Sequence, residues 1–493
     1  MELTRSAGIL LPISALPSPY GIGTLGKAAF DFIDFLAAAG QTYWQVLPVG
    51  PVSYGDSPYQ SFSSFAGNPY YVDLDRLAED GLLTPQEASA PDWGDDPGLV
   101  DYGKLYEHRF DVLKLAAARG VPREREALDA FRREKPWLAD YALFMALKRH
   151  FGMRPWHEWP DEDVRLHRPG ACARWRSALW EDVELFEYIQ LLFYRQWADL
   201  RAYAAEKGVR LIGDTPIYVA LDSADVWAEP YWFQLDERNV PTAVAGVPPD
   251  AFTEDGQLWG NPLYRWDAME RDGFGWWIRR LGGAFELFDV LRFDHFRGLE
   301  SYWAVPFGET TAKNGRWIPG PGERFVRAVF GWFPDKPIIA EDLGYLTPEV
   351  RSLLAFSGCP GMKILEFAFD PREPSDYLPH TYPRNCVCYT GTHDNDTLEG
   401  WRQETDPESL AFAKAYLGLS DAEGFGWGIL RGGMTSVADL FVAQMQDYLG
   451  LGSEARMNTP GIPHGNWRWR MDADALTDEL AARIAALTKL SGR

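Results

Sequence analysis

Short apolar runs recur along this chain, and longer stretches between them carry apolar residues at helical spacing. A run of four to eight apolar residues bounded by turn residues is typical of a buried strand, whereas steps of three and four indicate one face of a helix. We predict eight parallel strands, near residues 8–11, 43–47, 209–213, 290–293, 337–340, 362–366, 386–389 and 440–446.

Helical patterns connect these strands. Residues 28–39 place apolar and acidic side chains at helical spacing and are followed by Gly40, a common residue after a helix C-terminus. Residues 186–204 carry apolar side chains at steps of three and four and lead directly into the third strand. Eight strands joined by such crossovers predict an α/β protein of the (β/α)8 TIM-barrel class.

Two connections are too long for one crossover helix. The first, residues 70–180, contains helical patterns such as 137–150, and we expect a mostly helical subdomain there. The second, residues 218–275, contains a loop stiffened by prolines, which we expect to form a lid because loops after barrel strands cover the catalytic face. No repeat or low-complexity linker divides residues 1–493, so one catalytic barrel with two insertions is expected.

Three of the predicted strands are followed at once by acidic residues. Asp294 follows the fourth strand, and the pair Glu341-Asp342 follows the fifth. Asp394 and Asp396 follow the seventh. One acid in such a place is usually a helix cap or a surface charge. Spacings of about 50 residues, however, match one strand plus its crossover, so these carboxylates are expected to meet on one barrel rim. Cleavage of a sugar acetal is the commonest reaction that uses such a pair.

The composition narrows the possible partners. The chain has a formal net charge of −23, so nucleic acid and anionic membranes would be repelled and a neutral substrate is favoured. It contains 21 Trp, 22 Tyr and 28 Phe. Most of these rings are expected in the core, and the remainder suit a glucan site, because the C–H face of a sugar packs on an aromatic ring.

The cysteine and histidine patterns argue against disulfides and metals. Cys386 and Cys388 lie two apart in a predicted strand and are expected as buried thiols, and Cys172 and Cys359 complete no framework. The eight His show no ligand spacing. The N-terminal residues lack the pattern of a signal peptide, and no stretch is long and apolar enough to span a membrane, so we expect a cytoplasmic protein.

The ordered motifs resemble those of a known enzyme family. Arg292-Phe-Asp294-His295, Glu341-Asp342-Leu-Gly and Thr392-His393-Asp394-Asn395-Asp396 closely resemble conserved blocks of the amylomaltases, also called 4-α-glucanotransferases or disproportionating enzymes. The likeness spans nearly the whole chain. It implies a (β/α)8 barrel of the α-amylase clan that cuts α-1,4-glucans with retention and passes the piece to another sugar. Similar blocks are Gly213-Asp214-Thr-Pro-Ile-Tyr, Tyr54-Gly-Asp-Ser57-Pro-Tyr59-Gln, Gly67-Asn-Pro-Tyr, Gly361-Met-Lys and Gly452-Ser-Glu-Ala-Arg-Met-Asn.

The resemblance also implies roles for the three acids. Asp294 would be the nucleophile, Glu341 the general acid/base, and Asp394 the carboxylate that steadies the distorted sugar. The pattern of residues alone does not choose Glu341 over Asp342, or Asp394 over Asp396. Arg292 lies two residues before Asp294 on a strand, so both side chains point the same way and the positive charge favours an ionised nucleophile.

Further residues are expected to bind the sugar. His295 and His393 each adjoin a catalytic acid, although a histidine taken alone is more often structural. Asp214 could equally cap the turn after the third strand. Tyr59 and Trp259 could be core residues, but their polar surroundings favour stacking surfaces. The predicted substrate-binding set is Ser57, Tyr59, Asp214, Asp250, Gln257, Trp259, Arg292, His295, Asp370, His393 and Asn466, of which Asp370 and Asn466 rest mainly on their family blocks.

One position of the lid loop departs from the family. Many relatives carry an aromatic residue after the Pro-Pro-Asp of this loop, whereas Ala251 follows Asp250 here. Loss of that ring would weaken glucan threading or admit water, which leaves the ratio of transfer to hydrolysis open. Tyr54 and Tyr102 resemble a second glucan-contact patch of some relatives, away from the chemistry.

The prediction is therefore a 4-α-glucanotransferase, a monomer without cofactor or metal, that passes a segment of an α-1,4-glucan to the 4-hydroxyl of glucose, maltose or a longer malto-oligosaccharide. One alternative is a retaining α-glucan hydrolase with the same acids. A second is a glucan-binding protein without catalysis. A third is a barrel enzyme for phosphorylated sugars, which needs a glycine-rich phosphate loop, and Gly450-Leu-Gly452-Ser is a weak candidate for one.

Overall fold

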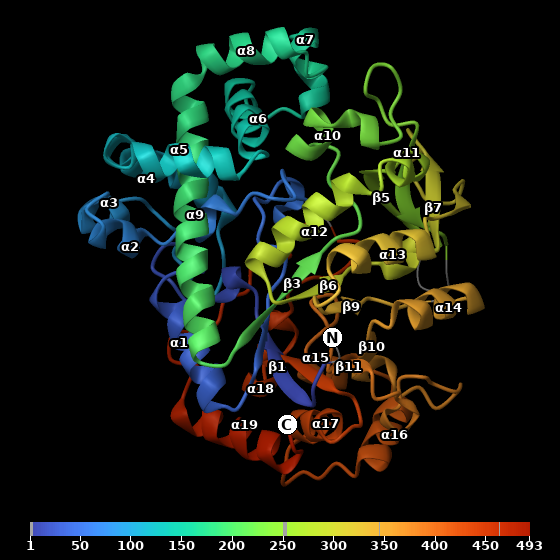
Figure 1. Ribbon diagram of the computed structural model, residues 1–493. Helices are drawn as coiled ribbons and strands as arrows, with labels where there is room; N and C mark the ends of the chain where they lie inside the picture. The colour runs from blue at the N-terminus through green and yellow to red at the C-terminus, as the bar shows by residue number, and fades with distance from the viewer. Residues whose placement is uncertain (1–2, 250–253, 345, 463) are drawn as a thin grey trace.

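Eight parallel strands form a barrel at the centre of the molecule, in the order β10-β11-β12-β1-β2-β3-β6-β9 (Figure 1). The computed structural model describes residues 3–249, 254–344, 346–462 and 464–493. Between the two end strands of this order, the Ala340 N–H donates to the Pro360 carbonyl oxygen at 2.9 Å, so the barrel is nearly closed. The strands are β1 (Ser6–Leu10), β2 (Tyr43–Gln45), β3 (Arg210–Thr215), β6 (Val290–Phe293), β9 (Ile338–Ala340), β10 (Gly361–Ile364), β11 (Cys386–Tyr389) and β12 (Leu440–Gln444).

These strands confirm the eight predicted from apolar runs, with differences at their ends. The prediction for β10 ran to residue 366 and that for β12 to residue 446, but the chain turns into the 3-10 helix Leu365–Phe367 after β10 and into α18 (Met445–Leu449) after β12. An apolar run continues into a buried helical turn without any change in hydrophobicity, so the pattern cannot mark this boundary.

Alternation along the strands fills the barrel with apolar side chains. Ile212, Val290, Ile339 and Tyr389 belong to one buried cluster that also contains residues of β1, β10 and β12. Neighbours in the sequence, such as Leu211 and Leu291, belong instead to the larger cluster shared with the surrounding helices. The residue two positions after each inward-facing residue therefore also points toward the barrel axis.

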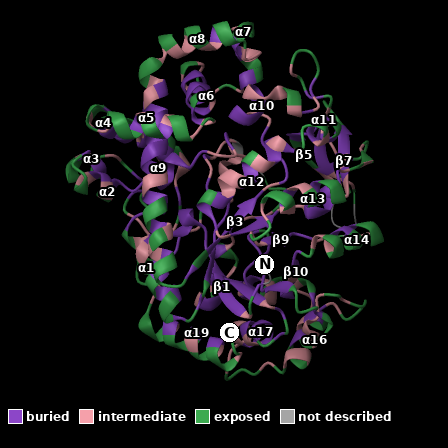
Figure 2. Ribbon diagram, in the orientation of Figure 1, coloured by how far each residue is buried: buried purple, intermediate pink, exposed green. Residues whose placement is uncertain are grey.

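Helices surround the barrel, and exposed positions gather on their outer faces (Figures 1 and 2). The helix predicted at 28–39 is α1 (Lys27–Ala38), which packs against α9 and α19, and the helix predicted at 186–204 belongs to α9 (Trp180–Glu206). The other helices outside the insertions are α12 (Gly275–Leu287), α13 (Glu323–Trp332), α14 (Pro348–Ser357), α15 (Leu398–Glu404), α16 (Pro407–Leu417), α17 (Phe425–Met434) and α19 (Asp478–Leu490).

The stretch predicted as a helical insertion, residues 70–180, is mostly helical between β2 and α9. Its helices lie beside and beyond the upper half of α9 in Figure 1. Buried tryptophans fill this region, and Trp156 and Trp159 are fully buried. The helices are α2 (Leu74–Glu79), α3 (Pro85–Ser89), α4 (Tyr102–Arg123), α5 (Arg125–Glu134), α6 (Leu138–His150), α7 (Glu162–Arg165) and α8 (Pro169–Ala178).

A second, antiparallel sheet of four strands stands beside the barrel in the order β5-β4-β7-β8. Two of its strands, β4 (Ala243–Val247) and β5 (Gln257–Pro262), come from the connection between β3 and β6, which also contains α10 (Ala224–Ala228) and α11 (Trp266–Arg271). The other two, β7 (Ser301–Pro306) and β8 (Arg316–Pro319), follow β6. Gln257 and Trp259 therefore lie on strand β5. The prediction from the sequence, which placed both in a loop, is wrong on this point.

None of the helices in the described ranges combines the length and the apolar character that crossing a membrane requires.

Candidate active site

Strand alternation directs four polar side chains into the barrel at the end formed by the C-termini of its strands. Asp214 lies two residues after the inward-facing Ile212, and Arg292 lies two residues after Val290. Asp294 continues the same face beyond β6. Glu341 lies two residues after Ile339, just past the end of β9. The barrel geometry therefore collects three carboxylates and one guanidinium in one place.

Arg292 joins two of these carboxylates. Its Nη1 donates to Asp214 Oδ2 at 2.7 Å and to Asp294 Oδ1 at 2.9 Å. The side chains of Arg292 and Asp214 are 3% and 0% exposed, whereas that of Asp294 is 27% exposed. Because only Asp294 of this trio reaches solvent, it is the carboxylate that a substrate can approach.

Backbone amides hold Glu341 in one orientation. The His295 N–H donates to Glu341 Oε2 at 2.7 Å, and the Leu343 N–H donates to Oε1 at 2.7 Å. His295 adopts a left-handed backbone with φ of 51°, which costs free energy for a residue with a side chain. Each oxygen of the carboxyl group is thus fixed, and the residue next to the proposed nucleophile supplies one of the two bonds.

Burial and charge raise the proton affinity of two acids in this group. Burial, with a further contribution from the charge of Asp294, raises the pKa of Glu341 to about 7, although Arg292 and the two amides oppose it. Burial also raises the pKa of Asp214 to about 7 against the opposing charge of Arg292. A carboxyl group that holds a proton near neutral pH can serve as a general acid.

The structure distinguishes the paired acids that the sequence could not. Asp342 Oδ1 accepts the Met362 N–H at 2.7 Å, so this side chain ties β9 to β10 outside the barrel axis. Asp396 accepts the Thr397 N–H and the Ser453 hydroxyl, both at 2.7 Å, and its side chain is 8% exposed. The side chain of Asp394, in contrast, is 48% exposed. These contacts support Glu341 and Asp394 as the acids that meet substrate.

Aromatic rings line the same region in two groups. Tyr59 stacks on His393 with ring centroids 4.8 Å apart, and Trp467 lies 5.9 Å from Tyr59 and 5.8 Å from His393. The Tyr59 hydroxyl donates to Asp214 Oδ2 at 2.9 Å, which links this group to the carboxylates. In the second group, the Trp259 ring meets His295 edge-on at 4.9 Å.

Burial favours the neutral form of both histidines of the site. Burial lowers the pKa of His295 to about 4 in spite of the nearby Asp294, and burial also lowers the pKa of His393. A neutral imidazole has one donor and one acceptor nitrogen, which suits hydrogen bonds to the hydroxyl groups of an uncharged sugar.

Other predicted residues have different surroundings. The Asn466 amide bonds to nearby backbone, since its Oδ1 accepts the Thr459 N–H at 2.9 Å and its Nδ2 donates to the Ile462 carbonyl oxygen at 2.8 Å. Asp370 pairs with the neighbouring Arg372, which lowers the pKa of Asp370 to about 2. Neither side chain shows a contact with the three proposed catalytic acids in the described part of the chain.

The remaining predicted residues have local contacts. Gln257 Oε1 accepts the Trp259 ring N–H at 3.1 Å, and the Ser57 hydroxyl accepts the Tyr59 N–H at 3.3 Å. The Tyr102 hydroxyl donates to the Trp467 carbonyl oxygen at 2.9 Å. Tyr54 lies in the 3-10 helix Tyr54–Asp56. Asp250 and Ala251 lie outside the described residues. The second glucan patch at Tyr54 and Tyr102 stays a prediction.

Three residues near the site were not singled out from the sequence. Trp467 belongs to the ring cluster described above, and Asn458 and Arg456 contact Asp394 directly. A signal was present, because Arg456 and Asn458 lie in the block Gly452-Ser-Glu-Ala-Arg-Met-Asn that resembles the family. Trp467 lies in irregular chain, where no hydrophobic periodicity predicts which side chains face the site.

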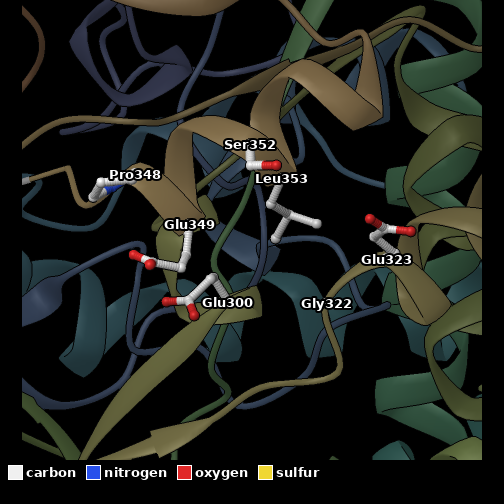
Figure 3. A pocket seen from close by; sticks show the side chains of 7 residues that line it. All are labelled: Glu300, Gly322, Glu323, Pro348, Glu349, Ser352 and Leu353. Atoms are coloured by element: carbon white, nitrogen blue, oxygen red, sulfur yellow. The ribbon is translucent and has the colours of Figure 1, made fainter.

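The described structure contains an open cleft away from the predicted site residues and a smaller hollow beside them. An open cleft of about 410 Å³ lies where α13 and α14 begin, and Glu300, Glu323 and Glu349 stand around it (Figure 3). None of the predicted site residues lines it. A small cavity of about 70 Å³ lies behind the site and is lined in part by Tyr59 and Asp214. Among the described residues, no group of three or more His, Cys, Asp and Glu is arranged to hold a metal ion.

Comparisons with known proteins agree with this geometry. A profile of the family described as 4-alpha-glucanotransferase matches residues 11–477. The 4-alpha-glucanotransferase of Thermus thermophilus is 51% identical over all of this chain and all of its own length, and that of Clostridium butyricum is 46% identical over 98% and 99%.

A solved structure leads to the same family. An amylomaltase from Streptococcus agalactiae, solved in complex with acarbose, superposes with a TM-score of 0.97 at 41% identity and covers 99% of each chain. An amylomaltase from Corynebacterium glutamicum shares the fold at 21% identity, with a TM-score of 0.77 over 98% of this chain and 75% of its own. The barrel, its converging acids and these likenesses together show that this chain belongs to the 4-alpha-glucanotransferase family.

Proposed function

We propose that this 4-alpha-glucanotransferase works by double displacement on α-1,4-glucans. Asp294 attacks the anomeric carbon while Glu341 gives a proton to the departing glycosidic oxygen, which leaves a covalent glycosyl ester on Asp294. Glu341, now ionised, then removes the proton of an acceptor 4-hydroxyl as that oxygen attacks the same carbon. The new glycosidic bond forms, the ester breaks, and both side chains regain their starting states.

One observation carries the assignment of roles. Asp294 is paired with the guanidinium of Arg292 and reaches solvent, while Glu341 is buried beside it with a pKa of about 7. Glu341 can therefore hold a proton near neutral pH, while the carboxylate that faces solvent at the same end of the barrel is paired with a guanidinium. Different protonation of two neighbouring acids is what a retaining mechanism requires.

The rest of the site supports a carbohydrate substrate. The aromatic group of Tyr59, His393 and Trp467 gives the site an apolar side that suits the C–H surface of a sugar, and the uncharged imidazoles that burial favours at His295 and His393 suit its hydroxyl groups. Asp394, with its exposed carboxylate, is proposed to accept hydroxyl hydrogen bonds from the distorted ring. Such bonds strengthen in the transition state and so favour reaction over simple binding.

The finer features of the reaction belong to the same proposal. Glucose, maltose and longer malto-oligosaccharides are the proposed acceptors, since each ends in a free 4-hydroxyl. The proposed enzyme works as a monomer in the cytoplasm without a cofactor, and its four free cysteines favour that compartment. The negative charge of the chain favours a neutral polymer over nucleic acid or an anionic membrane.

Incubation with maltotriose tests the proposal. Transfer produces glucose together with longer oligosaccharides, while the number of reducing ends stays constant, because every bond that breaks is replaced by another. Reducing ends that rise in step with glucose would mean hydrolysis instead. Asp294→Asn and Glu341→Gln are expected to lower the rate of either reaction at least about a thousandfold, and unchanged rates in these variants would overturn the assigned roles.

A further inference from the structure

Asp394 lies in a loop that several internal contacts hold in place. The Asn395 side chain accepts the Thr392 N–H at 2.9 Å, and the Gln444 amide donates to the Asp396 carbonyl oxygen at 2.9 Å. These bonds fix the backbone on either side of Asp394 but leave its own carboxylate free to turn about two side-chain torsions. An additional contact must therefore set the direction of the carboxylate oxygens.

That contact comes from residues 452–458, which follow the last barrel strand and which we call the bracket segment. Asn458 Nδ2 donates to Asp394 Oδ1 at 2.6 Å. His393 Nε2 lies 3.4 Å from the same oxygen. Oδ2 has no hydrogen-bonding partner among the described residues, and the side chain is half exposed. One oxygen is thus engaged by the protein, and the other remains available to a ligand.

Arg456 holds Asn458 and Asp394 together through their backbones. Its Nε donates to the Asn458 carbonyl oxygen at 2.8 Å, and its Nη2 donates to the Asp394 carbonyl oxygen at 2.7 Å. Its Nη1 also lies 3.8 Å from Asp396 Oδ2. The guanidinium fork therefore sets the distance between the two chain segments at which the Asn458 amide reaches the carboxylate.

The base of the bracket segment is anchored in the molecule. Ser453 donates its hydroxyl hydrogen to Asp396 Oδ2 at 2.7 Å, and Met457 is 2% exposed within the apolar cluster at the barrel interior. The Trp467 N–H donates to the Met457 carbonyl oxygen at 2.7 Å. The bracket segment thus connects Trp467, a member of the aromatic group of the site, with the loop that carries Asp394.

We propose that Asn458, supported by Arg456, is a positioning residue that turns the Asp394 carboxylate so that Oδ2 faces the bound glucan. This inference rests on the proposed function, because it assumes that Asp394 accepts hydroxyl hydrogen bonds from the reacting sugar. An amide suits the task, since it donates to a carboxylate without neutralising it and without competing for the proton that Glu341 transfers.

The test compares two substitutions at the same position. Asn458→Ala removes the donor and leaves space, whereas Asn458→Asp keeps the shape but replaces the donor by a second negative charge beside Asp394. We expect kcat for maltotriose disproportionation to fall about 10- to 100-fold in Asn458→Ala, with KM changed less than about threefold. The fall in Asn458→Asp is expected to be larger, because like charges at this distance repel.

A packing role for Asn458 predicts the opposite order of effects for the two substitutions. If Asn458 only filled space, the isosteric Asn458→Asp would be the milder change, and its effect would appear as a lower melting temperature with an unchanged kcat for the folded fraction. The matched control is Asn385→Ala, because the Asn385 amide also makes one bond to another segment, the Gly358 carbonyl oxygen at 3.0 Å, but lies on the exposed surface. This control is expected to keep its kcat.

The outcomes also separate this inference from the proposed function. A wild-type kcat in both Asn458 variants, together with inactive Asp294→Asn and Glu341→Gln variants, would overturn the positioning role alone. Active Asp294→Asn and Glu341→Gln variants would overturn the proposed function itself.

Discussion

At the scale of single residues, the surroundings of each carboxyl group determine its part in the chemistry. Asp294 pairs with Arg292, Glu341 is buried and held by two amides, and Asp394 is held by Asn458. Three acids with the same functional group thus have three different environments. The type of residue alone does not reveal these environments, because they also depend on contacts between distant segments, such as His295 with Glu341 and Asn458 with Asp394.

The proton affinity of Glu341 predicts how the rate depends on pH. Glu341 must hold its proton to act as the general acid, and its pKa is raised to about 7. As pH rises through this value the free enzyme loses that proton, so kcat/KM for maltotriose is expected to fall above about pH 7, about tenfold for each further pH unit.

An activated donor supplies the control. Fluoride leaves without a proton from the enzyme, so with α-maltosyl fluoride the fall in kcat/KM above pH 7 should disappear. The same alkaline fall with both donors would assign the titrating group to another step and contradict the role of Glu341.

Part of this site could be predicted from the sequence. Acids directly after buried strands are visible in the pattern, and the barrel places them on one rim. The choice between Glu341 and Asp342 needed the register of β9, because only the inward position of Ile339 shows which acid faces the axis. Asn458 and Trp467 contact the site from irregular chain, where hydrophobic periodicity gives no direction to a side chain.

At the scale of elements, the seam between β9 and β10 is where the regular strand pairing of the barrel is interrupted. The Ala340 N–H bonds to Pro360, and Asp342 Oδ1 accepts the Met362 N–H at 2.7 Å. The Asp342 carboxylate also leaves no space for a side chain at Gly361, whose added Cβ would lie 2.7 Å from Asp342 Oδ2. A side chain thus replaces part of the regular ladder where the barrel closes.

We therefore expect Asp342→Ala to destabilise the fold without removing the chemistry. The substitution leaves the buried Met362 N–H without an acceptor, which should lower the free energy of unfolding by about 1 to 3 kcal/mol. Urea denaturation measures this loss, and maltotriose disproportionation at 25 °C should stay within about threefold of wild type. Glu341→Gln provides the contrast, because it is expected to abolish activity whatever its effect on stability. A folded, stable Asp342→Ala that is inactive would exchange the roles of the two acids.

The elements also show where prediction from sequence ends. All eight barrel strands were found because each is a compact apolar run. The four-stranded sheet was not predicted, because its strands are short, partly exposed and supplied by two separate connections. No local pattern in the sequence predicts that such strands pair. This sheet matters for the site, since its strand β5 carries Gln257 and Trp259.

At the scale of the whole molecule, several buried acids affect stability together. Burial raises the pKa of Asp214, Glu341 and Asp447 to about 7 each, and burial together with the charges of Asp447 and Asp396 raises that of Glu366 well above its usual value. The folded state therefore binds more protons than the unfolded chain near neutral pH. Stability present at lower pH is lost as pH rises through these values.

We expect the free energy of unfolding to fall by about 2 to 4 kcal/mol between about pH 6.5 and pH 8. Chemical denaturation across this range measures the slope. Asp447→Asn removes one of the four titrating groups, so its slope should be shallower whatever its absolute stability. A stability that is constant or rises over this range would show that these acids are ionised in the folded protein.

The most direct test of the account is to trap the sugar on the nucleophile. In Glu341→Gln, α-maltosyl fluoride can still form the glycosyl ester, because fluoride needs no acid, but no base remains to activate an acceptor. Mass spectrometry is expected to show the protein heavier by one maltosyl unit, with the added mass on the peptide that contains Asp294. An adduct on another residue, or steady turnover of the fluoride without any adduct, would contradict the account.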